Sequence, residues 1–351
     1  MMLGGLHPDE KVGTFLIKGE SLSPGFSSSS FGSAPSFISL APDGSTAYVA
    51  NHGSSSPGVS AVSLKWGPGG DLISATPLQP QVRSPDPCHV SLHPNGRWLL
   101  SASYSEGSVT VFPVLQGGLL GTPNTTELGK NAHQVMFWSS DEVLVPLLGS
   151  DEVAVCEFEE TSGSLRHMYS IAFPPSSGPR HLAFHPTNNS LAYVACELSN
   201  TVGTIYRRVK DGVWETRDPF LSTIRTGLPV PTVQAVAALA ISSGGDFLYV
   251  SNRAAPFGSG DNSVAGFRIS SDGSLSPSPF IWAVGGEGPG KGVNFPRDIT
   301  LSPDGKFLAV ANQHGGSVSM FKRSEDSGNL SFLTTVSSAP VTTPSSVLIT
   351  F

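Results

Sequence analysis

The sequence has few charged residues and no long hydrophobic run. Charged residues make up 13% of the 351 residues, against about 25% in an ordinary soluble domain. Lys and Arg number 20 and Asp and Glu 27, which gives a net charge of −7, so no overall basic field attracts nucleic acid or an anionic membrane. No stretch approaches about 18 uninterrupted apolar residues, the length of a membrane-spanning helix. We therefore expect neither a nucleic-acid nor a membrane partner, although a local basic pocket is still allowed.

Cysteines are also scarce. Cys88, Cys156 and Cys196 form an odd, widely spaced set without a CxxC pair, which indicates neither a disulfide framework nor a zinc site. The sequence also lacks a Walker loop and a dinucleotide-binding Gly fingerprint, so we expect no cofactor. The segment Met1–Lys11 lacks the basic and apolar regions of a secretory signal. Together these absences favour a reduced, cytoplasmic location.

Glycine and proline, by contrast, are abundant. The chain has 39 Gly and 29 Pro, together 68 residues or roughly a fifth of the sequence, above the usual combined share of about 12%. Hydrophobic residues make up 38%. This composition is typical of short strands joined by many turns, and it predicts an all-β fold.

One pattern recurs along the chain. It consists of a Pro or Ala, an alternating apolar strand, a turn similar to Pro-Asp-Gly, a second apolar strand, and a segment similar to Ser-Val-x-x-Phe. Six copies begin at Pro35, Pro87, Ala132, Pro179, Ala235 and Pro296. Their spacing of about 45 to 60 residues is that of a four-stranded propeller blade with variable loops.

The two ends of the chain predict a seventh copy. Thr343–Phe351 has the pattern of an opening strand, and Met1–Gly5 and Val12–Lys18 could supply further strands. A blade built from both ends closes the ring and leaves few open sheet edges. We predict a single domain over residues 1–351, a seven-bladed β-propeller of four-stranded antiparallel blades closed by pairing of the N- and C-terminal strands. A six-bladed ring with loose tails is the alternative.

The repeat also predicts where polar side chains meet. In a β-hairpin, the residue before the first strand and the residue after the second lie at the same end, so these positions from all blades gather at one mouth of the central channel. At the first strands they include Cys88, His89, His133, Arg180, His181 and Arg297, and after the second strands Asn51, His52, Glu197, Asn252, Arg253 and Asn312–His314. The turn residues His93 and His185 fall on the opposite rim and are excluded.

Each of these residues has a structural interpretation beside a functional one. Arg180 and Glu197 should lie opposite each other on one hairpin, where they could simply neutralise one another. His133 could equally be structural or catalytic. Three arginines at one mouth, however, repel one another unless carboxylates or a bound anion offset their charge, which favours an anionic ligand.

Several strings in the sequence resemble those of the propeller-type lactonases, a family that includes bacterial 6-phosphogluconolactonase and the fungal carboxymuconate-lactonizing enzyme. The strings are PCHVSLHPNGRWLL, AHQV, GPRHLAFHP, CELSNTV, FLYVSNR and FPRDITLSPDGKFLAVANQ. The resemblance covers nearly the whole chain. It implies seven blades, no metal requirement and chemistry on a lactone ring at the channel mouth. Cys196 departs from the family pattern, because it replaces the usual Asn beside the acidic residue.

The resemblance implies that His133, Glu197, Arg180 and Arg253 are catalytic. The gathered set adds substrate-binding candidates: His89, His181, Arg297, Asn252 and Gln313. The implied reaction is hydrolysis of a sugar lactone, 6-phosphogluconolactone for preference, as in the pentose phosphate pathway, and the expected partner is this small anionic substrate. Either His133 or Glu197 could be the base that activates water.

Two other functions stay open. The first is an intramolecular lyase acting on a muconolactone, in which the arginines would bind carboxylates. The second is a non-catalytic interaction propeller, although the repeats lack the Gly-His and Trp-Asp signature of WD-repeat proteins.

Overall fold

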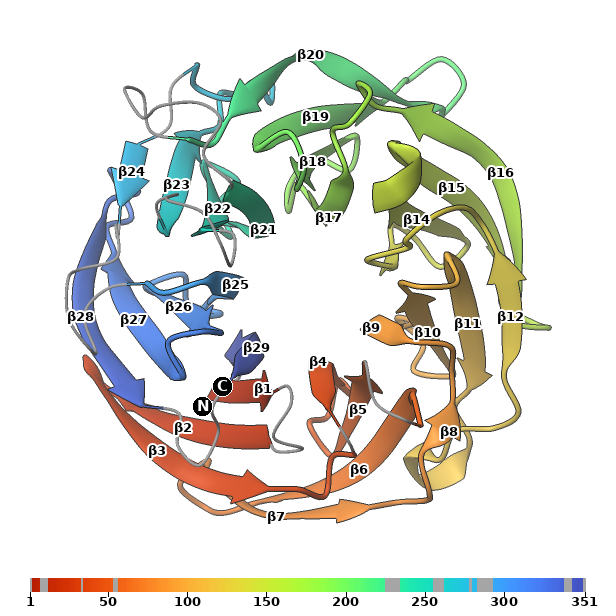
Figure 1. Ribbon diagram of the computed structural model, residues 1–351, viewed down its shortest axis with the longest axis vertical. Helices are drawn as coiled ribbons and strands as arrows, with labels where there is room; N and C mark the ends of the chain where they lie inside the picture. Colours follow the sequence, from red (N-terminus) through yellow and green to blue (C-terminus); the bar gives the residue numbers. More distant parts are fainter. Residues whose placement is uncertain are drawn as a thin grey trace.

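The computed structural model describes residues 2–6, 12–32, 34–52, 56–224, 234–254, 262–277, 280–282, 293–337 and 343–349. Within these residues the chain forms seven antiparallel sheets, arranged as blades around a common central axis (Figure 1). This arrangement confirms the predicted all-β seven-bladed propeller and excludes the six-bladed alternative. In the same residues, no helix is long and apolar enough to cross a membrane.

Each blade is named here after its innermost strand. The β4 blade comprises β4 (Pro35–Leu40), β5 (Thr46–Asn51), β6 (Gly58–Trp66), β7 (Leu72–Pro77) and β8 (Val82–Arg83). The β9 blade comprises β9 (Pro87–Leu92), β10 (Trp98–Ser103), β11 (Ser108–Pro113) and β12 (Asn124–Glu127). The β13 blade comprises β13 (Met136–Phe137), β14 (Glu142–Leu147), β15 (Glu152–Glu159) and β16 (Ser164–Ala172).

The β17 blade follows, with β17 (Pro179–Phe184), β18 (Leu191–Cys196), β19 (Thr201–Arg207) and β20 (Trp214–Ser222). The β21 blade has β21 (Gln234–Ile241), β22 (Phe247–Ala254), β23 (Ser263–Arg268) and β24 (Phe280–Trp282). The β25 blade has β25 (Pro296–Leu301), β26 (Phe307–Asn312), β27 (Ser317–Arg323) and β28 (Leu330–Ser337). Two short 3₁₀ turns, η1 (Gln116–Gly118) and η2 (Leu148–Ser150), lie between β11 and β12 and between β14 and β15, respectively.

The last blade closes the ring. Its inner strand is β29 (Pro344–Ile349), which pairs with β1 (Met2–Leu6), and β1 pairs in turn with β2 (Val12–Lys18), followed by β3 (Ser21–Ser28). Met2 lies opposite Ile349. The predicted pairing of the two chain ends is therefore confirmed. Met1, Thr350 and Phe351, which the prediction included, lie outside the described residues.

Two blades differ from the predicted pattern. The β4 blade has a fifth strand, because β8 pairs with β6 beyond the end of β7. In the β13 blade, ladder pairing starts at Met136 rather than at Ala132, which forms only an isolated bridge to Leu147. The facing strand β14 contains Pro146, which has no backbone N–H to donate. The His133 backbone N–H still donates to the Pro146 carbonyl oxygen, at 3.1 Å.

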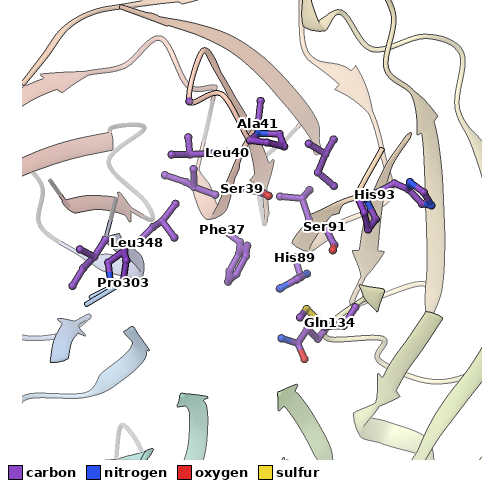
Figure 2. A pocket seen from close by; sticks show the side chains of 18 of the residues that line it. Phe37, Ser39, Leu40, Ala41, His89, Ser91, His93, Gln134, Pro303 and Leu348 are labelled. Carbon is purple, nitrogen blue, oxygen red and sulfur yellow. The ribbon is translucent and has the colours of Figure 1, made fainter. Parts of the chain in front are cut away.

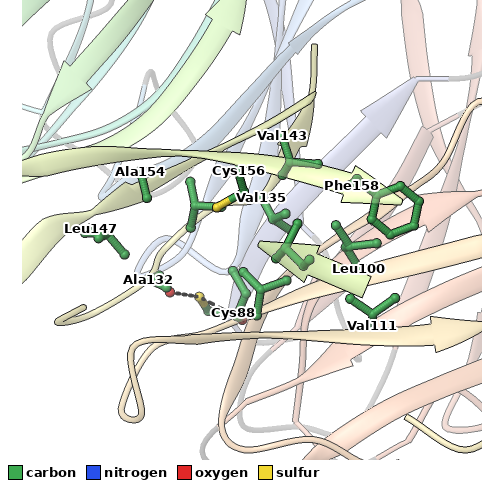
Figure 3. Close-up of a cluster of buried hydrophobic side chains, with 14 residues drawn as sticks. Cys88, Leu100, Val111, Ala132, Val135, Val143, Leu147, Ala154, Cys156 and Phe158 are labelled. Atoms are coloured by element: carbon green, nitrogen blue, oxygen red, sulfur yellow. Dashed lines mark hydrogen bonds between the residues drawn. The ribbon is translucent and has the colours of Figure 1, made fainter. Parts of the chain in front are cut away.

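Apolar side chains fill the space between neighbouring blades. Figure 3 shows one such cluster, which includes Leu100 and Val111 of the β9 blade and Val143 and Ala154 of the β13 blade. Cys88 and Cys156 belong to the same cluster, and all three cysteines are free and buried. The blades are thus held together by apolar contacts between their faces, which fixes the inner strands around the central axis.

Candidate active site

The inner strand of most blades is preceded by a residue with left-handed backbone. These residues are Ala34, Asp86, Asn131, Gly178 and Phe295, with φ between 35° and 62°. The carbonyl oxygen of each accepts the backbone N–H of the residue that follows the second strand, respectively from His52, Tyr104, Leu148, Glu197 and Gln313. This repeated bond fixes the two strand ends at one mouth of the channel, as the hairpin argument predicts. It sets the backbone positions of Glu197 and Gln313.

A bulge at the start of the inner strands turns an additional residue toward the mouth. In the β17 blade, Pro179 pairs with Cys196 and His181 with Ala195, so Arg180 is the extra residue of the bulge. Arg297 occupies the equivalent place in the β25 blade. A bulge re-aims the side chain next to it, and here it lets Arg180 and His181, adjacent in sequence, both contact residues of the mouth.

Arg180, Glu197 and Arg253 form one buried ion cluster. Arg180 Nε lies 2.8 Å from Glu197 Oε2, and Arg253 Nη2 lies 3.0 Å from Glu197 Oε1. Arg180 also donates from Nη1 to the carbonyl oxygen of Ala237, at 2.6 Å. The two arginines are 2% and 6% exposed, so they hold fixed positions from two neighbouring blades.

The charges of this cluster explain the state of its carboxylate. Burial alone would raise the pKa of Glu197, but the positive charges of Arg253, Arg180 and Arg297 outweigh burial and lower the pKa. Burial and the charge of Arg253 lower the pKa of Arg180 to about 9, which leaves it a cation at neutral pH. Glu197 is therefore an ionised group that holds two guanidinium groups in place.

A third guanidinium completes the positive field. Arg297 donates from Nη1 to Gln313 Oε1 at 3.3 Å, and within the described residues no carboxylate lies within 4 Å of it. Asp298, the next residue, directs its carboxylate away to the backbone N–H groups of Ile299 and Val347. The mouth therefore carries more positive than negative charge, which suits an anionic ligand.

Three histidines and one phenylalanine form an aromatic layer across the channel. The ring centroids of His133 and His181 are 5.0 Å apart, those of His181 and His89 6.0 Å, and those of His89 and Phe37 4.0 Å. Phe37 and His89 project toward the middle of the ring in Figure 2. We call these four side chains the aromatic layer.

All three imidazoles of the layer are neutral at pH 7. Burial, followed by the charge of Arg180, lowers the pKa of His89 to about 3 and holds the pKa values of His133 and His181 well below the usual 6.5. His133 and His89 are 6% and 3% exposed, and the Nδ1 atom of each is buried without a hydrogen-bond partner in the described part of the chain. A buried, unpartnered nitrogen is a group that a ligand or water can satisfy.

Asn252 and Gln313 differ from the other predicted residues. The side-chain amide of Asn252 donates to the Thr223 carbonyl oxygen and to Ser263 Oγ, and its Oδ1 accepts from Thr223 Oγ1. Asn51 and Asn312 make similar bonds to Ser60 and Ser319, so this asparagine joins the second strand to the third. These bonds give Asn252 a structural role, while Gln313 orients Arg297. Substrate binding by Asn252 stays a prediction that its contacts do not support.

The structure adds two residues that the sequence analysis did not single out. Tyr104 follows the second strand of the β9 blade, and its ring centroid lies 5.9 Å from that of His133. Phe295 lies under the guanidinium of Arg253, 5.3 Å from ring centroid to Cζ, and stacks on His314. The sequence could have indicated Tyr104, because it follows the second strand of its blade as Glu197 does. Within the described residues, no group of three or more His, Cys, Asp or Glu side chains is arranged to hold a metal ion.

Comparison with known proteins gives consistent matches. Residues 10–349 match the family described as "Lactonase, 7-bladed beta-propeller". The chain is 31% identical over 272 residues to a 6-phosphogluconolactonase of Bacillus subtilis, covering 74% of this chain and 72% of that protein. It is 30% identical over 255 residues to a 6-phosphogluconolactonase of Photorhabdus laumondii, covering 71% and 70% of the two chains. Among solved structures, the periplasmic gluconolactonase PpgL of Pseudomonas aeruginosa superposes with a TM-score of 0.80 and 26% identity, over 99% of this chain and 98% of that one.

Proposed function

Because the chain belongs to the lactonases built as seven-bladed β-propellers, we propose that it hydrolyses a sugar lactone, 6-phosphogluconolactone, to 6-phosphogluconate. The relatives named 6-phosphogluconolactonase support this substrate. The observation that carries the proposal is the excess of positive charge at the mouth, where Arg180 and Arg253 share one ionised carboxylate and Arg297 adds a third charge, beside the neutral His133. Guanidinium groups bind phosphate and carboxylate oxygens through paired hydrogen bonds.

In the proposed reaction His133 is the general base. Glu197 is a poor candidate, because each of its carboxylate oxygens is within 3.0 Å of an arginine and its pKa is lowered. His133 presents an unpartnered Nδ1 that can accept a proton from water. The water oxygen then bonds to the lactone carbonyl carbon, and an arginine stabilises the negative charge on the carbonyl oxygen. Collapse of this intermediate breaks the bond to the ring oxygen, which takes the proton back from His133.

The substrate itself contributes to this chemistry. After burial, the positive charges of Arg180, Arg297 and Arg253 are among the causes that lower the pKa of His133. A phosphate bound between these arginines offsets their charge, which raises the pKa of His133 and makes it a stronger base. In this proposal the arginines bind the anion, and the bound anion activates the imidazole.

The test is a comparison of two histidine variants with fresh 6-phosphogluconolactone. His133→Asn is expected to lower kcat by about 10²- to 10⁴-fold, the usual contribution of a general base. His185→Asn is the matched control, because His185 contacts the Gly245 carbonyl oxygen at a turn remote from the arginines. Its kcat should not change.

Three outcomes would contradict the proposal. Turnover of carboxymuconate in place of the sugar lactone would favour the intramolecular lyase. No turnover of either substrate by folded wild-type protein would favour a non-catalytic propeller. Full activity of His133→Asn would remove His133 as the base.

We also propose a cytoplasmic location. The three cysteines are free and buried, which is compatible with a reducing compartment. The similar gluconolactonase of P. aeruginosa is, by its name, periplasmic, so a periplasmic location is the alternative. Cell fractionation with a compartment marker distinguishes the two.

A further inference from the structure

The central channel contains a large cavity at the end opposite the arginines. It is lined by residues of the turns that follow the inner strands, including Pro42, His93 and Pro303. Its volume is about 930 Å³, within the range of about 300 to 1,000 Å³ that is usual for small-molecule sites. Figure 2 shows it from close by. We call it the turn-side cavity.

The turn-side cavity is separate from the candidate active site. His89 is the one candidate residue among the described residues that line it, and Arg180, His133 and Glu197 are not part of its wall. His89 and Phe37 belong to the aromatic layer, whose rings pack against each other at 4.0 to 6.4 Å between centroids. Phe37 and His89 line the cavity and His133 and His181 do not, so the layer lies between the cavity and the mouth.

The wall of the cavity is mainly apolar. Leu40, Leu92, Met136 and Leu348 come from four different blades, and each is only partly buried. Leaving such side chains in contact with water costs roughly 25 cal/mol per Å² of apolar surface, and an apolar ligand would remove that cost. Four blades contribute to the same apolar ring, so the feature does not depend on one exposed residue.

The charge of the wall selects an uncharged ligand. Among the described lining residues there is no Lys or Arg, and the carboxylate of Asp43 is exposed at the outer edge. His89, at the inner end, is neutral because burial lowers its pKa to about 3. A charged ligand would lose its hydration in this cavity without finding a charged partner.

Two polar groups at the inner end can bind one polar atom of a ligand. The buried Nδ1 of His89 has no hydrogen-bond partner among the described residues. Gln134 Oε1 accepts the backbone N–H of Leu182 at 2.6 Å, which leaves its amide nitrogen for a further bond. Gln134 and His89 both project toward the middle of the ring (Figure 2).

We propose that the turn-side cavity is a second binding site for an uncharged small molecule with an apolar body and a single hydrogen-bonding group. The apolar body packs against Leu92, Met136 and Leu348. The polar group lies at the inner end, between His89 and Gln134. His89 is the one residue that this site shares with the candidate active site, and the proposal does not depend on the lactonase function.

The test uses N-phenyl-1-naphthylamine, an uncharged aromatic amine whose fluorescence rises in apolar surroundings. The wild-type protein is expected to bind it with a stoichiometry of about one. Met136→Glu, which puts a charge into the wall, is expected to weaken binding at least about tenfold, equivalent to about 1.4 kcal/mol. Met168→Glu is the matched control, since Met168 is an exposed residue of the same blade, and its binding should equal that of the wild type.

A second variant guards against a folding defect in Met136→Glu. Ser39→Phe fills the cavity from β4 without adding charge, and it is expected to abolish binding with an unchanged melting temperature. Lactone hydrolysis should be retained in both variants. The proposal is overturned if the wild type does not bind the amine, if both cavity variants bind it normally, or if Met168→Glu weakens binding as much as Met136→Glu.

Discussion

The two ends of the central channel are built by the same sheets but carry opposite chemistry. At one end, Arg180 and Arg253 pair with Glu197 and Arg297 adds a third positive charge. At the other end, Leu92 and Met136 belong to an apolar ring. Neutral imidazoles lie between the two. The comparison shows that the propeller sets positions only, while the residues at its strand ends decide the chemistry. It also shows how buried charge is tolerated, because two of the three arginines at the mouth share one carboxylate and the third bonds to the Gln313 amide, whereas no Lys or Arg is among the described residues that line the apolar end.

The largest effect should come from removing the carboxylate that pairs the cations. Glu197→Gln leaves buried guanidinium groups without a negative partner, and we expect it to lower the free energy of unfolding by about 3–5 kcal/mol. Glu157→Gln is the control, because Glu157 pairs with Arg166 on the surface, where such pairs contribute less than about 1 kcal/mol. Urea denaturation measures both. Equal, small losses in the free energy of unfolding would mean that the ion cluster at the mouth stabilises the fold no more than a surface ion pair does.

Acid should destabilise the protein through the aromatic layer. His89, His133 and His181 have lowered pKa values in the folded state, so near pH 5 these groups bind about three more protons in the unfolded chain. Asp298, whose pKa is raised to about 6 by burial, takes up about one proton in the folded state and offsets part of this. Unfolding therefore takes up about two protons in total. Near pH 5 the free energy of unfolding falls by about 2.7 kcal/mol for each unit by which the pH is lowered.

Urea denaturation at pH 7.5 and pH 5.0 tests this dependence. His89→Phe should reduce the slope by about one proton, because it removes one neutral buried imidazole and keeps an aromatic ring in the layer. A His167→Phe control should leave the slope unchanged, since His167 is exposed on an outer strand. A stability that is the same at both pH values would contradict the neutral state of the layer.

The smallest effect should be on substrate affinity. Arg297→Gln removes one charged hydrogen-bond donor from the mouth, worth about 1.5–3 kcal/mol, so KM for the phosphorylated lactone should rise roughly 10- to 100-fold. Arg217→Gln, which removes a surface arginine paired with Asp272, is the control. If KM is unchanged in Arg297→Gln, the anion is bound by Arg180 and Arg253 alone.

The repeats were enough to predict the blades and the gathering of polar residues at one mouth. Each copy carries its own apolar alternation and turn signal, so the hairpins can be predicted locally. The meeting of Arg180 with Glu197 follows from the same logic, because both flank one hairpin. The pairing of Arg253 with Glu197 joins two blades. The sequence could predict that these two residues lie near each other only if the blades were assumed to close into a ring.

Three features could not be predicted because they depend on tertiary context. The bulge that directs both Arg180 and His181 to the mouth is a matter of register, which the apolar alternation does not specify. The hydrogen bonds of Asn252 depend on Thr223, which directly follows β20 and so precedes the repeat that contains Asn252. The short β13 follows from one proline on the facing strand, whose effect needs the pairing partner to be known.

The closing blade also has a consequence for how the molecule is made. During synthesis, β1 leaves the ribosome long before β29, its partner on the channel side. Until β29 arrives, β1 exposes a row of unpaired backbone groups at an open edge, and the contact that covers it spans nearly the entire chain, the slowest kind to form. A truncated product that ends before Pro344 would keep that edge exposed. Chaperones and proteases could then recognise unfinished copies by this unpaired strand edge.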